Sequence, residues 1–227
     1  MDEKRKGLLY VHGAIFLFGG TGLFAKLIDL PASDIILWRS LLATLVLLAI
    51  LLLLRRPIRL QQRRHFPLML ICGLLLGSHW ITYFHSMQIA GVAVGMLALY
   101  TSPIMTVFLE PLFHGKRPHL NDVLCAALVF FGVVLLVPDF SLENDITIGV
   151  CWGVLSAGLF ALRNVMQRHY LQNYGGDTSM LYQSAVAALL AMPLVSANPA
   201  EFDGEILLQM VLLATLFTAI PHSLFAG

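Results

Sequence analysis

Four ionisable residues interrupt long apolar stretches of this sequence: Lys26, Arg39, Glu110 and Arg163. An ionised side chain inside the hydrocarbon core of a membrane costs about 3 kcal/mol or more, so it is usually kept there for a function. A cation can hold a carboxylate, and a carboxylate can carry a proton. These residues are therefore the first candidates for chemistry.

Lys26 and Arg39 are expected near the same end of two consecutive apolar stretches. One interpretation is a pair of cations at an outer gate that attracts the carboxylate of a solute. Other interpretations are neutralisation by Asp29 and Asp34, or extension of the long basic side chains to lipid headgroups.

Glu110 and Arg163 are expected toward the opposite end of their stretches. A buried salt bridge between them would satisfy both charges and could act as a structural link or as a gate. Without such a partner, Glu110 is a candidate carrier of a coupling proton.

A proline marks a further candidate feature near the middle of its apolar stretch. Pro103 has no N–H, so the carbonyl of Leu99 loses its helical partner and a kink is expected. The hydroxyls of Tyr100 and Ser102 adjoin this kink, which suits a solute cavity or a gate. A kink that only serves helix packing is the other interpretation.

Aromatic and amide side chains supply the remaining candidates. His79, Trp80 and Tyr83 give one stretch a polar and aromatic stripe, which could stack on a solute or simply pack between helices. Asn164 and Gln183 are weaker candidates for solute contacts from the second half of the chain.

Composition determines the elements that must position these residues. Of the 227 residues, 58% are hydrophobic and 12% are charged, and the mean hydropathy is +0.81. A soluble domain carries about 25% charged residues. A lipid bilayer is therefore the expected surrounding. The net charge of +1 gives no indication of a nucleic-acid partner.

The apolar stretches are long enough to cross a membrane, for which about 20 residues are needed. Backbone groups in lipid must bond internally, so the stretches are expected to be helices. The sequence predicts an all-α integral membrane protein with about eight transmembrane helices. Their expected ranges are 8–28, 35–54, 67–90, 92–114, 120–138, 146–167, 179–197 and 205–227.

Basic residues occur in alternate loops. They precede the first apolar stretch and lie in the loops that follow the second, fourth and sixth stretches. Lys116 and Arg117 lie in the loop after the fourth stretch. The intervening loops hold acidic residues but no Lys or Arg. Cytoplasmic loops carry an excess of Lys and Arg. The pattern therefore predicts a multi-pass protein with its N-terminus in the cytoplasm.

An internal repeat relates two apolar stretches. The string Gly-Leu-Phe-Ala occurs at 22–25 and again at 158–161. The offset predicts a first repeat of five helices over 1–138 and an incomplete second repeat of three helices over 146–227. A repeat with an odd number of helices must invert, and inverted repeats are a known transporter design with solute bound between the halves.

The sequence resembles the EamA-type branch of the drug/metabolite transporter superfamily over essentially its whole length. The resemblance rests on Gly22 to Lys26, on the pair Trp38-Arg39, and on the run from Tyr83 to Leu109 that contains Pro103. It implies a carrier of small metabolites, an exporter of amino acids or related solutes, that works by alternating access between inverted halves. It also implies a bacterial inner membrane and makes a homodimer and a coupling proton further partners to test.

The sequence departs from the family pattern in two respects. Lys116 stands where family members commonly have Glu, and the last two helices of the ten-helix family fold are missing after Gly227. The alternative function is therefore a truncated membrane protein that does not transport, or an assembly partner.

Enzyme, cofactor and metal chemistry find no support in the sequence. The motifs of serine hydrolases and zinc proteases are absent, and no Cys/His spacing is typical of a metal site. The three cysteines, Cys72, Cys125 and Cys151, lie in apolar runs, which argues against a disulfide framework. We expect neither catalytic residues nor a cofactor.

Overall fold

The computed structural model describes residues 3–115, 118–135, 137, 141, 143–199 and 202–221. All regular structure within these residues is helical. The main helices are α1 (Glu3–Leu27), α2 (Ala32–Leu53), α3 (Phe66–Ala90), α4 (Val92–Leu99), α5 (Ser102–His114), α6 (Leu120–Val134), α7 (Asp145–Tyr170), α8 (Gly176–Ala191) and α9 (Gly204–Ala214). Short helical turns are η1 (Arg63–His65), η2 (Met192–Leu194) and η4 (Thr215–Ala219).

Four helical stretches in the described part are long and apolar enough to cross a membrane: Ala32–Leu53, Arg63–Ala90, Val92–Phe113 and Asp145–Tyr170. Shorter apolar helices cover Ile15–Leu27, Leu120–Val134 and Gly204–Ala219. The expected all-helical membrane fold is therefore confirmed. The count of eight crossings stays a prediction, because several helices are shorter than a full span.

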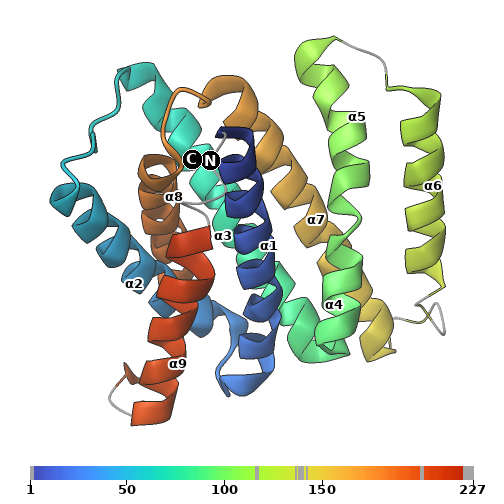
Figure 1. The fold of residues 1–227 in the computed structure, drawn as a ribbon. Coiled ribbons are helices and arrows are strands. Elements are labelled where there is room, and N and C mark those ends of the chain that lie inside the picture. Colours follow the sequence, from blue (N-terminus) through green and yellow to red (C-terminus); the bar gives the residue numbers. More distant parts are fainter. Residues whose placement is uncertain are drawn as a thin grey trace.

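Connecting segments gather at two ends of the helix assembly, because the helices run in alternate directions, with α5 continuing in the direction of α4 (Figure 1). The start of α1, the loop 54–65 and the turn 171–175 lie at one end, which we name the basic end. Five arginines occupy its first loop: Arg55, Arg56, Arg59, Arg63 and Arg64. Lys116 and Arg117 lie outside the described residues.

Small residues allow α3 to approach α8 closely. A Cβ atom built on Gly73 would lie 2.6 Å from Cβ of Val186, and one on Gly77 would lie 2.9 Å from Cα of Ala187. Neither position leaves room for a side chain, so the two glycines fix how near α8 lies to α3. Close approach through small residues is typical of membrane helices, which have no hydrophobic force to hold them together.

Glycines on α7 have the same role toward α3 and α4. Gly149 lies against Ala90, and a Cβ on Gly153 would come within 2.5 Å of Cβ of Ala98. The hydroxyl of Ser86 donates a hydrogen bond of 2.6 Å to the carbonyl of Gly149. The helix pair α3–α4 and α7 therefore pack backbone against backbone.

The expected single helix over 92–114 is interrupted. α4 ends at Leu99 and α5 begins at Ser102, with Pro103 at its start. Proline restricts the residue before it and cannot donate to the preceding turn, so the helix breaks where a kink was predicted. Gly91 is the single residue between α3 and α4. Its φ is 93°, a conformation that favours glycine.

Candidate functional site

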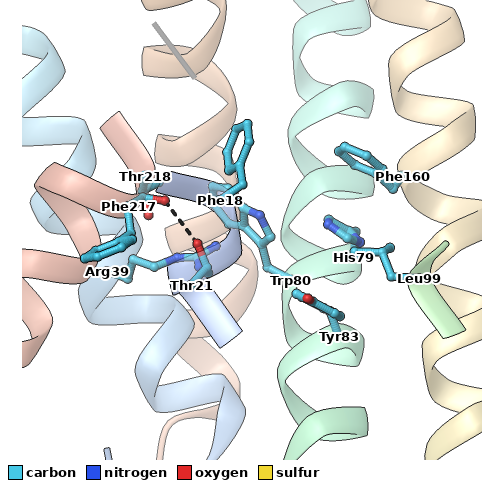
Figure 2. A pocket seen from close by; sticks show the side chains of 10 residues that line it. All are labelled: Phe18, Thr21, Arg39, His79, Trp80, Tyr83, Leu99, Phe160, Phe217 and Thr218. Atoms are coloured by element: carbon cyan, nitrogen blue, oxygen red, sulfur yellow. Dashed lines mark hydrogen bonds between the residues drawn. The ribbon is translucent and has the colours of Figure 1, made fainter. Parts of the chain in front are cut away.

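A central cavity opens where α1, α2, α3, α4, α7 and η4 meet (Figure 2). Its volume is about 190 Å³, room for about six water molecules at about 30 Å³ each. The described residues that line it are Phe18, Thr21, Arg39, His79, Trp80, Tyr83, Leu99, Phe160, Phe217 and Thr218. None of these ten is acidic.

Arg39 carries the only formal charge among the lining residues. Its side chain is 1% exposed, and its Nε and Nη2 atoms have no hydrogen-bond partner in the described part of the chain. The guanidinium carbon lies 3.9 Å from the ring centroid of Trp80 and 5.1 Å from that of Phe84. Such contacts contribute about 2 kcal/mol when desolvated, which is less than the several kcal/mol that burying an ion costs. Among the described residues, nothing that lines the cavity therefore neutralises the positive charge of Arg39.

Asp34 does not neutralise Arg39, contrary to one interpretation of the sequence. Its carboxylate is fully buried and accepts hydrogen bonds from the backbone N–H groups of Ser196 at 3.1 Å and Ala197 at 2.7 Å. Asp34 thereby fastens the start of α2 to the segment after η2. No ion pair joins Asp34 to Arg39 in the part of the chain that the structure describes.

Lys26 and Arg39 do not share a cavity, so the expected outer-gate pair of cations is wrong. Lys26 donates a hydrogen bond of 2.8 Å to the carbonyl of Gln88, and it lines a separate, exposed depression together with Asp29. Depth in the sequence alone predicts the same end for both residues. The exposed side of α1 carries Lys26, whereas Arg39 faces the centre.

His79, Trp80 and Tyr83 line the cavity together. His79 Nδ1 lies 2.7 Å from the hydroxyl oxygen of Ser156. The imidazole stacks on Phe160, with ring centroids 4.6 Å apart, and on Tyr83 at 5.8 Å. This wall presents flat apolar faces with polar edges.

Several cavity residues escaped prediction. Phe18 and Thr21 belong to α1, Phe160 to α7, and Phe217 and Thr218 to η4. Only Phe160 had a signal, because it lies in the repeated Gly-Leu-Phe-Ala string. The five-residue π-helical turn Thr215–Ala219 turns Phe217 and Thr218 toward the cavity, and such turns have no sequence signature. Thr21 donates a hydrogen bond of 3.4 Å to the Phe217 carbonyl.

The candidates beside Pro103 lie outside this cavity. Tyr100 is 59% exposed, and the Ser102 carbonyl accepts the hydroxyl of Thr106 at 2.9 Å. Leu99, one residue before Tyr100, is the lining residue instead. Neither Tyr100 nor Ser102 lines the central cavity, which the sequence could not reveal.

A second cavity of about 460 Å³ lies at the basic end, between α5, α7 and α8. We name it the basic-end cavity. Arg163 donates from Nε to Oε1 of Gln183 at 2.7 Å and from Nη1 to Oδ1 of Asn164 at 2.9 Å. Three predicted residues are therefore brought together, although away from the central cavity.

Glu110 does not form the expected salt bridge with Arg163. Its Oε1 lies 2.8 Å from Nη1 of Arg168, one and a half turns further along α7. The side chains are 38% and 74% exposed, respectively. An exposed ion pair of this kind contributes below about 1 kcal/mol, so it is a weak link.

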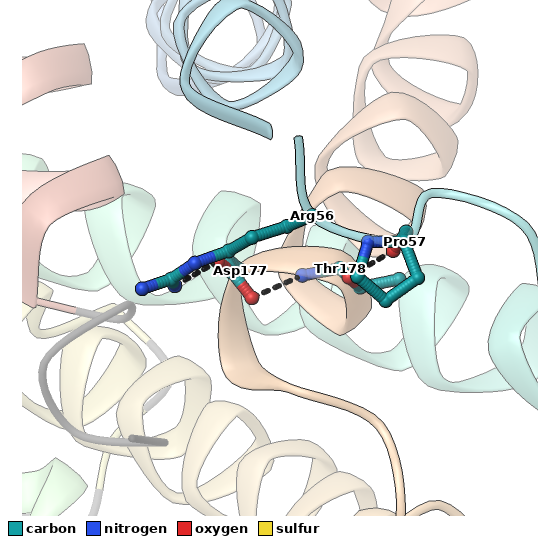
Figure 3. Close-up of polar contacts among 4 residues, drawn as sticks. All are labelled: Arg56, Pro57, Asp177 and Thr178. Atoms are coloured by element: carbon teal, nitrogen blue, oxygen red, sulfur yellow. Dashed lines mark hydrogen bonds and ion pairs between the residues drawn. The ribbon is translucent and has the colours of Figure 1, made fainter. Parts of the chain in front are cut away.

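The loop after α2 is fastened to the start of α8 at the basic end (Figure 3). Arg56 Nη1 lies 2.5 Å from Oδ2 of Asp177, a largely buried carboxylate. Beside it, the hydroxyl of Thr178 donates a 2.9 Å hydrogen bond to the carbonyl of Pro57. The first and second halves of the chain are thus held together at this end.

Metal-binding chemistry has no site in the described part of the chain, where no group of three or more His, Cys, Asp or Glu side chains converges. Cys72, Cys125 and Cys151 are free thiols.

The comparisons with known proteins agree with each other. The model of the EamA-like transporter family matches residues 5–137. The pseudopaline exporter CntI of Pseudomonas aeruginosa is 26% identical, and the match covers 86% of this chain and 68% of that protein. The uncharacterized transporter YxxF of Bacillus subtilis is 22% identical, with 98% of this chain and 73% of that protein covered.

A solved crystal structure shares the fold. Its TM-score is 0.72 at 19% sequence identity, with 97% of this chain and 77% of that chain covered. The likeness concerns the arrangement of helices alone.

Proposed function

Because this chain belongs to the EamA-like transporter family, we propose that it carries small metabolites with a carboxylate group, binding them at Arg39 in the central cavity. It is a multi-pass membrane transporter of the drug/metabolite type, like its relatives. The substrate class and the direction of transport are the proposal.

One observation carries the proposed substrate class. Arg39 is a buried guanidinium whose Nε and Nη2 have no partner in the described residues, and it borders an open cavity. These neighbouring donors match the two oxygens of a carboxylate, which can accept both hydrogen bonds in parallel. A bound carboxylate would satisfy the donors and neutralise the charge at once.

The walls of the cavity suit the rest of such a solute. Trp80, Tyr83 and Phe160 present aromatic faces on which a flat apolar group can stack. The same faces attract an ammonium group, so an amino acid fits although none of the described lining residues is acidic. An aromatic amino acid combines all three features.

Alternating access would expose this cavity to each side in turn. We propose that the halves 1–138 and 146–227 are inverted repeats and that the basic end faces the cytoplasm of a bacterial cell. Export is the direction that we favour, and a relative at 26% identity is named an exporter. Proton coupling through Glu110 and a homodimer stay predictions, and the exposed pairing of Glu110 with Arg168 gives coupling little support.

Counterflow in proteoliposomes tests the proposal. Liposomes containing the protein are loaded with unlabelled L-phenylalanine, L-glutamate or succinate, and uptake of the same labelled solute is followed. We expect uptake of at least one solute, L-phenylalanine above all, and a loss of at least tenfold in Arg39→Gln.

Two controls sharpen this experiment. Arg59→Gln removes an exposed arginine from the basic end and should leave uptake unchanged, whereas Arg39→Lys keeps the charge and should retain part of it. No uptake of any of the three solutes would favour the alternative of a membrane protein that does not transport. If Arg39→Gln leaves uptake unchanged, Arg39 does not form the proposed binding site.

A further inference from the structure

We propose that the basic-end cavity is a second binding station for the same carboxylate group, centred on Arg163 and reached from the central cavity along one face of α7. The inference rests on the proposed function and deepens it by naming where the solute is held between the central cavity and the basic face. The sequence predicts a gate residue paired with Glu110 at this position, whereas the amide partners of Arg163 indicate a binding role.

One stripe of α7 lines both cavities. Phe160 faces the central cavity, and Arg163, Asn164 and Gln167 face the basic-end cavity. Residues three and four apart share a helix face, so these four side chains form a continuous row. The row begins at Ser156, which contacts His79 in the wall of the central cavity.

The charge of Arg163 is oriented but not cancelled. Its hydrogen-bond partners, Gln183 and Asn164, are neutral amides. In the part of the chain that the structure describes, the nearby acids have cations of their own: Glu110 contacts Arg168, and Asp177 contacts Arg56. Arg163 thus projects a net positive charge into the basic-end cavity.

A chain of amides holds this cation in place. Gln183 is fully buried, accepts from Arg163 and donates at 2.7 Å to Oε1 of Gln167. Gln167 in turn donates at 3.1 Å to the hydroxyl of Ser179. Amides that already accept and donate within the chain fix the guanidinium fork before a ligand arrives, which lowers the entropic cost of binding.

The two stations differ in size and dryness. The basic-end cavity is about 460 Å³, and its described lining combines Arg163 and Arg168 with amide and hydroxyl side chains and two apolar residues, whereas the central cavity is about 190 Å³ and mostly aromatic. A solute that keeps part of its water fits the first, and a desolvated solute fits the second. Arg163 would thus collect or release the carboxylate that Arg39 holds more tightly.

Cysteine accessibility tests the station without requiring transport. Thr106 lines the basic-end cavity from α5, opposite Arg163. Thr106→Cys is made in a chain with Cys125→Ser and Cys151→Ser, while the fully buried Cys72 is left in place. The reagents are methanethiosulfonates that carry either a sulfonate or a trimethylammonium group.

We expect Arg163→Gln to lower the ratio of sulfonate to trimethylammonium modification rates about fivefold or more, because one nearby cation is lost. Arg163→Lys keeps the charge and should keep the ratio, which also shows that the result is not misfolding. Arg64→Gln, an exposed arginine at the same end, should not change it. L-Phenylalanine should slow modification at least threefold, whereas L-phenylalaninamide should not.

The outcomes separate the two proposals. Three results would overturn the second station, even where uptake depends on Arg39. They are a modification ratio unchanged by Arg163→Gln, a cysteine that neither reagent modifies, and the absence of protection by L-phenylalanine. An Arg163-dependent ratio with protection by L-phenylalanine supports the station, even where proteoliposomes show no uptake and the transport proposal fails.

Discussion

The guanidinium carbon of Arg39 lies 3.9 Å from the ring centroid of Trp80, so a fully buried cation rests on the face of an indole. The two residues come from α2 and α3 and meet at the wall of the central cavity. An aromatic face stabilises the cation without occupying its hydrogen-bond donors. In the proposed function, a solute carboxylate takes the Nε and Nη2 donors of this cation.

Replacing this indole should weaken solute binding. We expect Trp80→Leu to reduce the affinity for a carboxylate solute about tenfold, because Arg39 loses its platform and can turn away. Binding of L-phenylalanine to the purified protein, measured by scintillation proximity, checks this. Trp152→Leu is the matched control, since Trp152 packs against His85 and does not line the cavity. Equal affinity in both variants would contradict the platform role.

The contact between α3 and α8 should not tolerate even a methyl group. Gly77→Ala places a Cβ 2.9 Å from Cα of Ala187, so we expect a loss of about 1–3 kcal/mol in stability. Gly132 on α6 has no atom within 4 Å of a built Cβ, and Gly132→Ala should be neutral or stabilising. Thermal unfolding in detergent compares the two. A Gly77→Ala variant as stable as the Gly132→Ala variant would mean that the helices are not in close contact.

The carboxylate of Asp34 should matter for stability more than for charge. Asp34→Asn keeps the shape but weakens the hydrogen bonds from Ser196 and Ala197, so we expect a loss of about 1–2 kcal/mol. Asp29→Asn alters an exposed carboxylate on the neighbouring loop and should cost little. Unfolding curves of the two variants give the comparison, and indistinguishable curves would count against the fastening role of Asp34.

A double-mutant cycle should detect the ion pair between Arg56 and Asp177. Arg56 is 56% exposed, so the coupling energy should be only about 1 kcal/mol and should fall as salt is added. Arg56→Gln, Asp177→Asn and the double variant supply the cycle, measured by thermal unfolding. Additive effects of the two substitutions would show that the contact contributes nothing.

Reporter fusions test the orientation of the helix assembly. A fluorescent protein that folds only in the cytoplasm should be bright after Arg59 and dark near Asp145, because the basic loops are expected inside. Phosphatase fusions at the same points should give the opposite pattern. Equal signals at both positions would invalidate the assignment of the two ends.

Residue type and depth pointed to four of the ten described residues that line the central cavity. Arg39, His79, Trp80 and Tyr83 are costly or bulky side chains in apolar stretches, and the structure gathers all four around one space. Such residues need compensation inside a membrane protein, so their types alone point inward. The helix break before Pro103 follows from the same kind of local argument.

Partner choice could not be predicted in this way. Arg163 and Arg168 lie on the same helix only five residues apart, and sequence depth cannot resolve which of them reaches Glu110. Helix rotation, which packing decides, directs Arg163 toward Gln183 instead. The same limit applies to Phe217, whose position depends on a π-helical turn.

Gly91 gives the central cavity one stiff side. Because a single residue with φ of 93° links α3 to α4, these two helices cannot slide past each other. Gly149 and Gly153 bring α7 into direct contact with both helices. Tyr83, Leu99 and Phe160 should consequently move together as one rigid body. We expect the cavity to open on the opposite side, where α1, α2 and α9 would move relative to these three residues. Arg39, which lies on α2, would move with them.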